Sequence, residues 1–321
     1  MAAQNTPFET QLRPYGRATI AEAARLLLEG LPVATPTETV YGLAADATNA
    51  QAVARIYEAK GRPGYNPLIV HVGDLADAER IAHLSDAARM LAAVYWPGAL
   101  TMVLRQREGN GIAPAVTAGL DTIAVRVPAH PVMRDLLAAC ASPLAAPSAN
   151  ASGGISPTCA AHVLKTLAGR IPLIIDGGAT AQGLESTIIR LSGEGIALLR
   201  PGPIPFSELA EHSGLAEEEA SGNIEAPGQL ASHYAPAKPL RLNATHADAD
   251  EWLVGFGSVD GDENLSAEGS LSQAATRLFA ALHTADAQDR PRIAVAPIPE
   301  EGIGTAVNDR LRRAAAPKET P

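Results

Sequence analysis

Helical patterns alternate with short apolar runs over the first two thirds of this 321-residue chain. Residues 18–30 and 49–61 repeat apolar side chains at helical spacing and end in glycine, which commonly terminates helices. Residues 67–72, PLIVHV, form a β-branched run that is typical of a buried strand. Further helices are expected at 85–95, 131–140 and 159–169, and further strands at 31–37, 99–106, 122–128, 144–150, 171–178, 186–191 and 197–202. This order predicts an α/β domain built on a twisted open mixed sheet with flanking helices.

The composition of the chain changes after about residue 206. Residues 207–228 are acidic, contain Gly and Ser and are poor in large apolar side chains, as is typical of a linker or a partly ordered excursion. From Lys238 onward strand and helix patterns alternate again, which predicts a small Rossmann-like α/β unit. We therefore expect a first domain at residues 1–206, a linker at 207–237 and a small C-terminal α/β domain at 238–321.

Charge and apolar content restrict the class of function. The formal net charge is −10, whereas a lasting grip on a nucleic-acid backbone normally needs a basic surface, so we expect no stable nucleic-acid binding. The chain shows no signal-peptide core and no apolar run of membrane-spanning length, so we expect a cytoplasmic protein without a membrane partner. Cys140 and Cys159 are too few for a disulfide framework and lack metal-ligand spacing. We expect buried thiols and no metal site.

A polar cluster follows the first apolar strand of the sequence. Thr37, Glu38 and Thr39 lie just beyond the run that Pro36 breaks. A single threonine there would fit a capped turn leading into a helix. As a cluster at the end of a strand, these residues match the place where α/β sheets bind ligands.

Three cations and a histidine lie close to apolar runs. Lys60 and Arg62 flank a glycine, so alternation places both on one side of an extended loop that could bind a polyphosphate, although such a pair is more often simply solvated. His71 lies inside an apolar strand, where a histidine is more often a core residue than a ligand. Arg126, in the strand at 122–128, needs an anionic partner, either a carboxylate of this protein or an anion brought by a substrate.

Small residues crowd the segment 144–158. Ser148, Asn150 and Ser156 offer side-chain donors beside accessible backbone amides, an arrangement that lets a phosphate approach the main chain. No Gly-Lys-Ser/Thr follows, so this is not a Walker A loop, and a flexible surface turn is the alternative. Two further strand ends carry polar groups, Ser186 and, before a rigid Pro-Gly turn, Arg200.

Several catalytic motifs are absent from the sequence. It contains no His-Glu-x-x-His, no Gly-x-Ser-x-Gly and no Cys-x-x-Cys. The polar loops supply cations and hydroxyls instead of a nucleophile and base, and such groups suit electrostatic catalysis on a phosphoryl group. From the residues alone we infer an α/β enzyme that binds an anionic, nucleotide-like ligand.

An ordered set of segments resembles the YrdC-like family of L-threonylcarbamoyladenylate synthases. The resemblance spans about residues 15–206 and rests on residues 36–43, 60–72, 122–128, 146–153, 185–191 and 198–202. Residues 226–240, APGQLASHYAPAKPL, resemble the linker of the long, two-domain form. Residues 264–283 and 302–315 resemble its small C-terminal domain.

The resemblance implies synthesis of L-threonylcarbamoyl-AMP and pyrophosphate from ATP, L-threonine and bicarbonate, for threonylcarbamoyladenosine in tRNA. It implies that ATP binds against Lys60, Arg62, Thr122, Ser148, Asn150, Ser156 and Arg200, and that Tyr234 closes over the nucleotide from the linker. L-threonine would be held by Thr37, His71, Arg126, the backbone near Ala146, and Ser186. Lys60 and Arg62 are the expected catalytic residues, and Mg2+ is expected to arrive with the triphosphate.

The expected partner is a tRNA threonylcarbamoyl transferase that receives the labile product. Two alternatives of other classes remain at this point. One is an RNA-binding module of the same fold, against which the acidic charge and the scarcity of aromatic side chains weigh. The other is a carbamoyl-transfer domain of the hydrogenase-maturation type, which normally accompanies zinc-finger-like cysteine motifs that this sequence lacks.

Overall fold

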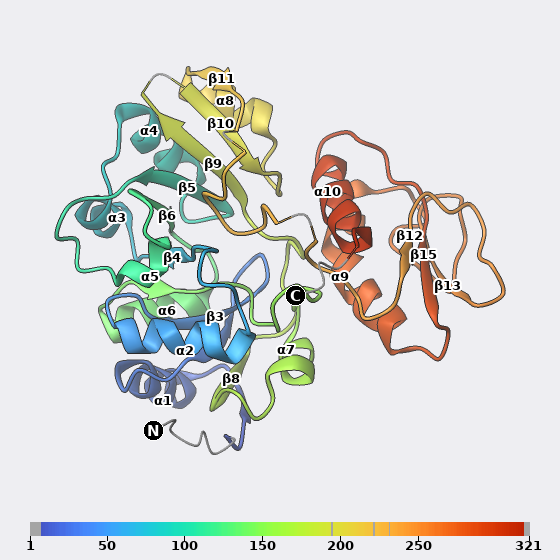
Figure 1. Ribbon diagram of the computed structural model, residues 1–321, viewed down its shortest axis with the longest axis horizontal. Helices are drawn as coiled ribbons and strands as arrows, with labels where there is room; N and C mark the ends of the chain where they lie inside the picture. Colours follow the sequence, from blue (N-terminus) through green and yellow to red (C-terminus); the bar gives the residue numbers. More distant parts are fainter. Residues whose placement is uncertain (1–7, 194, 221, 231, 318–321) are drawn as a thin grey trace.

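Two β-sheets organise the chain, and each belongs to its own domain (Figure 1). The computed structural model describes residues 8–317 except residues 194, 221 and 231. The strands are β1 Gln11–Pro14, β2 Val33–Pro36, β3 Tyr41–Asp46, β4 Ile69–His71, β5 Leu100–Arg105, β6 Thr122–Arg126, β7 Leu144–Ala145, β8 Leu173–Asp176, β9 Thr187–Ser192, β10 Gly195–Arg200, β11 Ala216–Glu218, β12 Leu240–Arg241, β13 Glu251–Gly255, β14 Glu263–Asn264 and β15 Arg292–Val295. The helices are α1 Arg17–Leu28, α2 Ala50–Lys60, α3 Leu75–Ile81, α4 Asp86–Tyr95, α5 Pro114–Thr117, α6 Pro131–Cys140, α7 Ala160–Leu167, α8 Phe206–Ser213, α9 Leu271–Ala287 and α10 Gly304–Ala315.

The large sheet has eleven strands in the order β1-β8-β2-β3-β7-β4-β6-β5-β9-β10-β11. Parallel neighbours, such as β4 with β6, alternate with antiparallel ones, such as β2 with β3, so the sheet is mixed as predicted. The small sheet has the order β12-β15-β13-β14, and each of its neighbouring pairs is parallel. Together with α9 and α10 it forms the second α/β domain that the sequence predicted.

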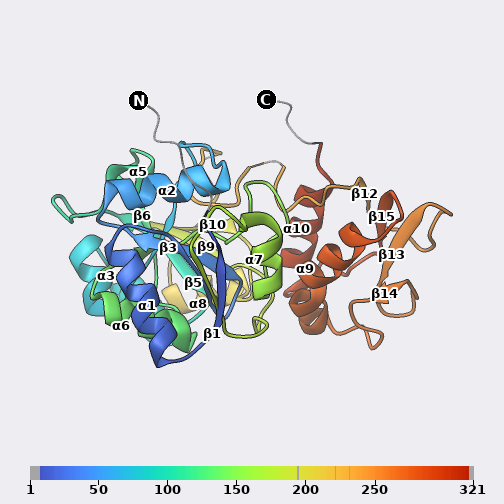
Figure 2. The same cartoon turned by 90° about the horizontal axis from the view of Figure 1, so that it is seen from below.

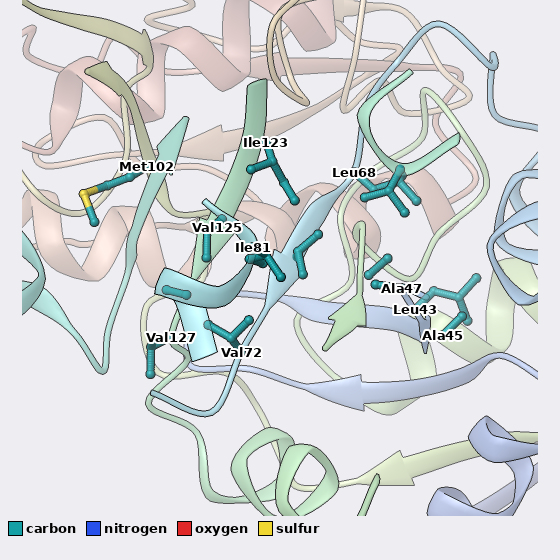
Figure 3. Close-up of a cluster of buried hydrophobic side chains, with 14 of the residues drawn as sticks. Leu43, Ala45, Ala47, Leu68, Val72, Ile81, Met102, Ile123, Val125 and Val127 are labelled. Atoms are coloured by element: carbon teal, nitrogen blue, oxygen red, sulfur yellow. The ribbon is translucent and has the colours of Figure 1, made fainter. Parts of the chain in front are cut away.

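Alternating side chains of the large sheet enter two cores. On β2, Ala34 joins the core that α2 and α7 cover, whereas Val33 joins the core that α1 and α6 cover. On β3, Leu43 points to the first of these cores and Ala44 to the second. Figure 3 shows part of the first core, where Leu43 is drawn with residues of neighbouring strands and helices. Because both faces are buried, the strands read as apolar runs in the sequence.

Both ends of helix α2 are set by residues that could be recognised in the sequence. The Asn49 side chain accepts hydrogen bonds from the backbone N–H groups of Gln51 and Ala52, which have no partner within the helix. Gly61 follows the last helical residue with φ 60°, in the left-handed region that glycine adopts most readily. The predicted helix at 49–61 is therefore confirmed, and Lys60 is its final residue rather than part of a loop.

The first third of the segment predicted as a linker at 207–237 contains regular structure. Residues 206–213 form α8, whose Leu209 and Ala210 pack into the first core, and residues 216–218 form β11, which pairs in parallel with β10. Residues 206–218 therefore pack on the large domain, and the bounds 1–206, 207–237 and 238–321 stay predictions. The sequence concealed this because β11 is fully exposed and acidic. Residues 1–7, 194, 221, 231 and 318–321 of the predicted segments lie outside the described residues.

The two domains share a hydrophobic core. Val40 and Leu184 of the large domain join a cluster that includes Phe279 of α9 and Leu311 of α10. Helices α9 and α10 accordingly lie between the small sheet and the large domain in both views (Figures 1 and 2). Within the described residues, no helix is both long and apolar enough to cross a membrane.

Candidate active site

Four strand ends of the large sheet converge on one pocket. His71, Arg126 and Arg200 are the last residues of β4, β6 and β10, and Thr37 follows β2. Parallel pairing of β4 with β6 places His71 directly beside Arg126. The pocket is lined by Thr37, Thr39, Val40, Gly42, Arg62, Ile69, His71, Arg126, Ala146, Pro147, Ser148, Glu185, Ser186, Arg200, Pro227, Gly228, His233 and Tyr234. This is the strand-end position at which α/β sheets bind ligands.

The internal partner of Arg126 is Glu38. A guanidinium nitrogen of Arg126 lies 2.5 Å from a Glu38 carboxylate oxygen, and both side chains are buried. Arg126 also donates to the Gly98 carbonyl at 3.0 Å and to the Thr39 hydroxyl at 3.0 Å. Burial disfavours the Glu38 carboxylate, but the charge and hydrogen bond of Arg126 outweigh it and lower the pKa of Glu38. A guanidinium has five N–H groups, so Arg126 keeps donors for a further anion.

His71 is held neutral in the pocket wall. It is 2% exposed, and its Nδ1 atom has no hydrogen-bond partner among the described residues. Burial, followed by the charge of Arg126, lowers the pKa of His71 to about 3. At neutral pH the ring is therefore uncharged and one ring nitrogen can accept a hydrogen bond.

Arg200 joins the strand ends to the linker. Its Nε and Nη2 atoms donate to the Ser186 carbonyl at 3.1 and 3.0 Å, and Nη2 also donates to the Ser186 hydroxyl at 3.1 Å. Its Nη1 atom donates to the Pro227 carbonyl at 3.4 Å. Burial lowers the pKa of Arg200, which remains a cation at neutral pH.

The sequence suggested that Lys60 and Arg62 lie on a loop that could bind a polyphosphate, or else that both are solvated. The structure buries both side chains. Lys60 is 2% exposed, and its Nζ atom donates to the carbonyls of Ser148 and Asn150 at 2.6 and 2.5 Å. Arg62 is 8% exposed and lines the pocket, while its nitrogens donate to oxygens of Asn66 and the carbonyl of Pro67. Burial lowers the pKa of Lys60 well below its usual value and that of Arg62 to about 10. Lys60 is buried because it is the last residue of helix α2 and faces the protein interior. The sequence argument, which assumed side chains alternating along an extended loop, could not predict this.

Four of the predicted site residues lie outside the pocket lining: Lys60, Thr122, Asn150 and Ser156. The Lys60 ammonium donates hydrogen bonds to the backbone carbonyls of Ser148 and Asn150. Ser156 donates a hydrogen bond to Glu185, which itself lines the pocket. Thr122 begins β6, whereas the pocket residue Arg126 ends it. Thr122 and Arg126 are four residue steps apart along the strand, which is a distance of roughly 13 Å. The other predicted site residues are brought together.

The space inside the pocket is small, and the linker supplies part of its lining. About 40 Å3 is open to the centres of water molecules, which holds about three waters at 10–15 Å3 each. Pro227, Gly228, His233 and Tyr234 of the linker supply one wall. This space is smaller than a nucleotide.

Sequence comparisons agree with this arrangement. Residues 25–202 match the family described as Telomere recombination, which groups Sua5, YciO and YrdC, and residues 204–316 match that described as Threonylcarbamoyl-AMP synthase, C-terminal domain. The chain belongs to the threonylcarbamoyl-AMP synthase family. Membership confirms the resemblance seen in the motifs and the predicted class of enzyme, a nucleotidyltransferase of the threonylcarbamoyladenosine pathway.

The relatives cover nearly the whole chain. The threonylcarbamoyl-AMP synthase of Pyrococcus abyssi is 40% identical over 91% of this chain and 93% of its own length. That of Bacillus subtilis is 38% identical over 92% of each chain. The structure is similar to the crystal structure of P. abyssi Sua5 complexed with L-threonine, with a TM-score of 0.87, 38% identity, and coverage of 95% of this chain and 97% of that one.

Sequence reasoning missed several lining residues of this synthase. Glu38 was seen only as part of a polar cluster, although an arginine in an apolar strand signals that a buried carboxylate lies nearby. Glu185, Gly228 and His233 carried no signal of their own, because neighbours far apart in sequence give them their place. Gly228 has φ 90°, and a Cβ atom there would lie 2.7 Å from Arg200 and 2.8 Å from the Tyr234 hydroxyl oxygen.

The described residues offer no cluster of three or more His, Cys, Asp and Glu side chains spaced to hold a metal ion. Both carboxylates in the pocket lining already accept hydrogen bonds from arginines, Glu38 from Arg126 and Glu185 from Arg310. The protein groups alone therefore do not form a magnesium site.

Proposed function

We propose that this pocket joins L-threonine, bicarbonate and ATP into L-threonylcarbamoyl-AMP with release of pyrophosphate. The observation that carries the proposal is the convergence of the buried side chains of Arg62, Arg126, Arg200 and the neutral His71 on one pocket. Three cations in low dielectric strongly favour anionic reactants, and the neutral imidazole provides an acceptor beside them. The P. abyssi relative forms a complex with L-threonine, which supports threonine as the amino-acid substrate.

We assign the threonine end of the pocket to Thr37, His71, Arg126, Ser186 and the backbone near Ala146. The remaining N–H groups of Arg126 face a carboxylate, and the hydroxyls of Thr37 and Ser186 suit a hydroxy amino acid. Since His71 is uncharged above a pH of about 3, it accepts a hydrogen bond from the amino group. A neutral acceptor, unlike a carboxylate, adds no negative charge that would stabilise the ammonium form. The free amine takes up carbon dioxide to give a carbamate, and one proton is released.

The nucleotide end is assigned to Arg62, Ser148, Arg200 and Tyr234. A carbamate oxygen attacks the α-phosphorus of ATP, and the bond to pyrophosphate breaks. Both reactants are anions, so Arg62 and Arg200 offset their repulsion and the charge that develops on the leaving group. Lys60 acts through the carbonyls of Ser148 and Asn150 and fixes the loop on which the phosphates rest. Magnesium enters with the triphosphate, where it offsets phosphate charge.

The linker residues that line the pocket have a role in the proposed reaction, which is to keep water from its labile compounds. The carbamate and the acyl phosphate product both hydrolyse in water, so a segment that excludes solvent protects them. The product is then handed to a tRNA threonylcarbamoyl transferase, and the acidic chain does not itself hold the tRNA. A gel-shift titration tests the second point, and a tight complex with tRNA at physiological salt would contradict it.

Pyrophosphate release from ATP tests the proposed reaction. We expect full activity only when threonine and bicarbonate are both present, and mass spectrometry should detect threonylcarbamoyl-AMP. Serine lacks one methyl group and should react more slowly, by a difference of roughly 1 kcal/mol or somewhat more in transition-state binding. Brisk release without an amino acid, or equal rates with serine, would show that the pocket has another substrate.

A further inference from the structure

One helix of the C-terminal domain reaches the wall of the pocket. Arg310 of α10 is completely buried, and its Nε atom donates to a carboxylate oxygen of Glu185 at 2.8 Å. The other carboxylate oxygen of Glu185 accepts a hydrogen bond from Ser156, so both are engaged. The Nη1 atom of Arg310 donates to Asp309 at 2.7 Å. Glu185 lines the pocket, which makes this ion pair a direct link between the second domain and the site.

The same helix holds the linker. The Arg313 side chain donates to the Leu230 carbonyl at 2.6 Å, and the Arg313 carbonyl accepts the backbone N–H of His233 at 3.2 Å. The Arg310 guanidinium carbon lies 5.1 Å from the centre of the Tyr234 ring, within the range of a cation–π contact. Helix α10 therefore contacts the linker on both sides of residue 231.

Tyr234 occupies a conformation that its own sequence does not favour. Its φ is 63°, in the left-handed region, where a bulky aromatic residue is strained. The side chain is 1% exposed, and its hydroxyl has no hydrogen-bond partner among the described residues. That hydroxyl points to the pocket side, beside Gly228 and Arg200. Such strain persists only where surrounding contacts determine the position, and here these contacts include Arg310 and the Phe279 ring at 5.6 Å.

We propose that Arg310 is a positioning residue of the synthase, through which the C-terminal domain fixes Tyr234 against the nucleotide end of the pocket. The inference rests on the proposed function for the identity of the ligand, ATP. The guanidinium is suited to this role because a single planar group can donate to a carboxylate and also lie over an aromatic ring. Here it donates to Glu185 and has its central carbon 5.1 Å from the centre of the Tyr234 ring. A buried ion pair stabilises a fold little compared with apolar side chains of similar volume, so positioning accounts for this one better than stability does.

The experiment compares the charge-balanced double variant Glu185→Gln/Arg310→Gln with wild type in the full chain. The double change avoids a buried unpaired carboxylate at position 185. We expect the KM for ATP to rise about tenfold with a smaller change in kcat, because the linker wall is no longer held. The matched control is Arg312→Gln, since Arg312 lies on the exposed side of α10 and pairs with Glu300 there at 2.5 Å. It should leave both constants unchanged.

The background Tyr234→Ala separates positioning from a general structural role. If Arg310 acts through the tyrosine, the double change has little further effect on the KM for ATP once the ring is gone. Equal increases in both backgrounds would overturn the proposal, as would an unchanged KM in the first comparison. Arg310→Lys keeps the charge but loses the planar group, and should show the same KM increase in a variant that retains the stability of the wild type.

Hydrogen exchange tests the role of Arg310 without a measurement of enzymatic activity. The backbone N–H groups of His233 and Ala235 are bonded to Arg313 and Gly153, and we expect both to exchange faster in the double variant. If wild type shows no threonine-dependent pyrophosphate release, the proposed function fails while the exchange result still tests the role of Arg310. If exchange is unchanged, the positioning role fails whatever the reaction.

Discussion

Arginines and carboxylates pair in both domains, but they do so in opposite surroundings. In the large sheet, Arg126 and Glu38 meet with side chains that are 4% and 11% exposed. In the small sheet, Arg292 and Asp250 meet at 2.6 Å with side chains that are 40% and 49% exposed. The first pair lies at strand ends that form a pocket, whereas the second lies at the start of β13 and β15, away from the pocket.

This difference shows how burial changes what a charge does. Water screens the exposed pair and competes for its hydrogen bonds, so it contributes little to either stability or binding. Burial removes that screening, so each buried charge depends on its partner and also acts strongly on a ligand. The following predictions test this comparison in order of decreasing effect.

Arg126→Met should be the most damaging of these changes. It leaves the Glu38 carboxylate buried without its cation, which costs about 3–5 kcal/mol of unfolding free energy. Urea unfolding measures the loss. The double variant Glu38→Gln/Arg126→Met, which leaves no unpaired charge, should recover part of it. A loss as small as that of an exposed pair, under about 1 kcal/mol, would mean that water reaches Glu38 and that burial does not distinguish the two pairs.

Lys60→Met should weaken the fold and slow pyrophosphate release. The carbonyls of Ser148 and Asn150 lose their donor, at a cost of about 1–3 kcal/mol, and the loop that they belong to becomes freer. Urea unfolding and the pyrophosphate assay measure the two effects. The matched control is Lys165→Met, whose ammonium is half-exposed and lies 3.8 Å from Asp286. Wild-type stability in Lys60→Met would place this lysine among solvated cations after all.

His71 should make the large domain sensitive to acid. Its pKa is about 3 in the folded protein and 6.5 ordinarily, so between these values the unfolded chain binds a proton that the folded chain does not. Its contribution is therefore complete above pH 6.5 and is lost as the pH falls toward 3. From pH 7 to pH 5 the wild type should lose up to about 2 kcal/mol more unfolding free energy than His71→Asn. Equal losses in urea unfolding would show that His71 is protonated in the fold.

Arg292→Gln should have the smallest effect. Its partners Asp248 and Asp250 are about half-exposed, and water replaces those contacts. Its buried third partner, Glu251 at 3.7 Å, keeps its ion pair with Arg241 at 2.6 Å. The urea midpoint and the rate of pyrophosphate release should both stay close to those of the wild type. A marked drop in stability would show that the exposed ion pairs of the small sheet matter as much as the buried ones.

Most helices and strands could be predicted from local signals in the sequence. The helix at 49–61 could be placed from its asparagine, its periodic apolar residues and its glycine, because these residues act within one helix. Strand β3 was missed because four of its six residues, Gly42, Ala44, Ala45 and Asp46, are of types depleted in strands. Antiparallel pairing with β2 determines its structure instead. Strand β11 likewise exists only because β10 offers it an edge.

The candidate site was predicted less evenly. Thr37 and Arg200 were predicted at strand ends, and the structure has them there, as sheet topology favours for ligand sites. His71 and Arg126 were predicted inside their strands, and the structure shows them as the last strand residues. Lys60 was misplaced, because whether a cation is solvated or buried depends on the surface that packs against it. Glu185 and Arg310 are 125 residues apart in sequence, and no local pattern joins them.

The sequence by itself determined the family, the two α/β patterns and the residue types that meet at the pocket, because motifs and periodicity are local properties of the chain. Only the tertiary structure decided the protonation of His71, the partner of Arg126 and the buried place of Lys60, because desolvation is a property of everything packed around a group. It also brings the C-terminal domain into contact with Glu185, which lines the pocket. Docking of α10 places a buried arginine beside a strained tyrosine, and neither residue predicts the other.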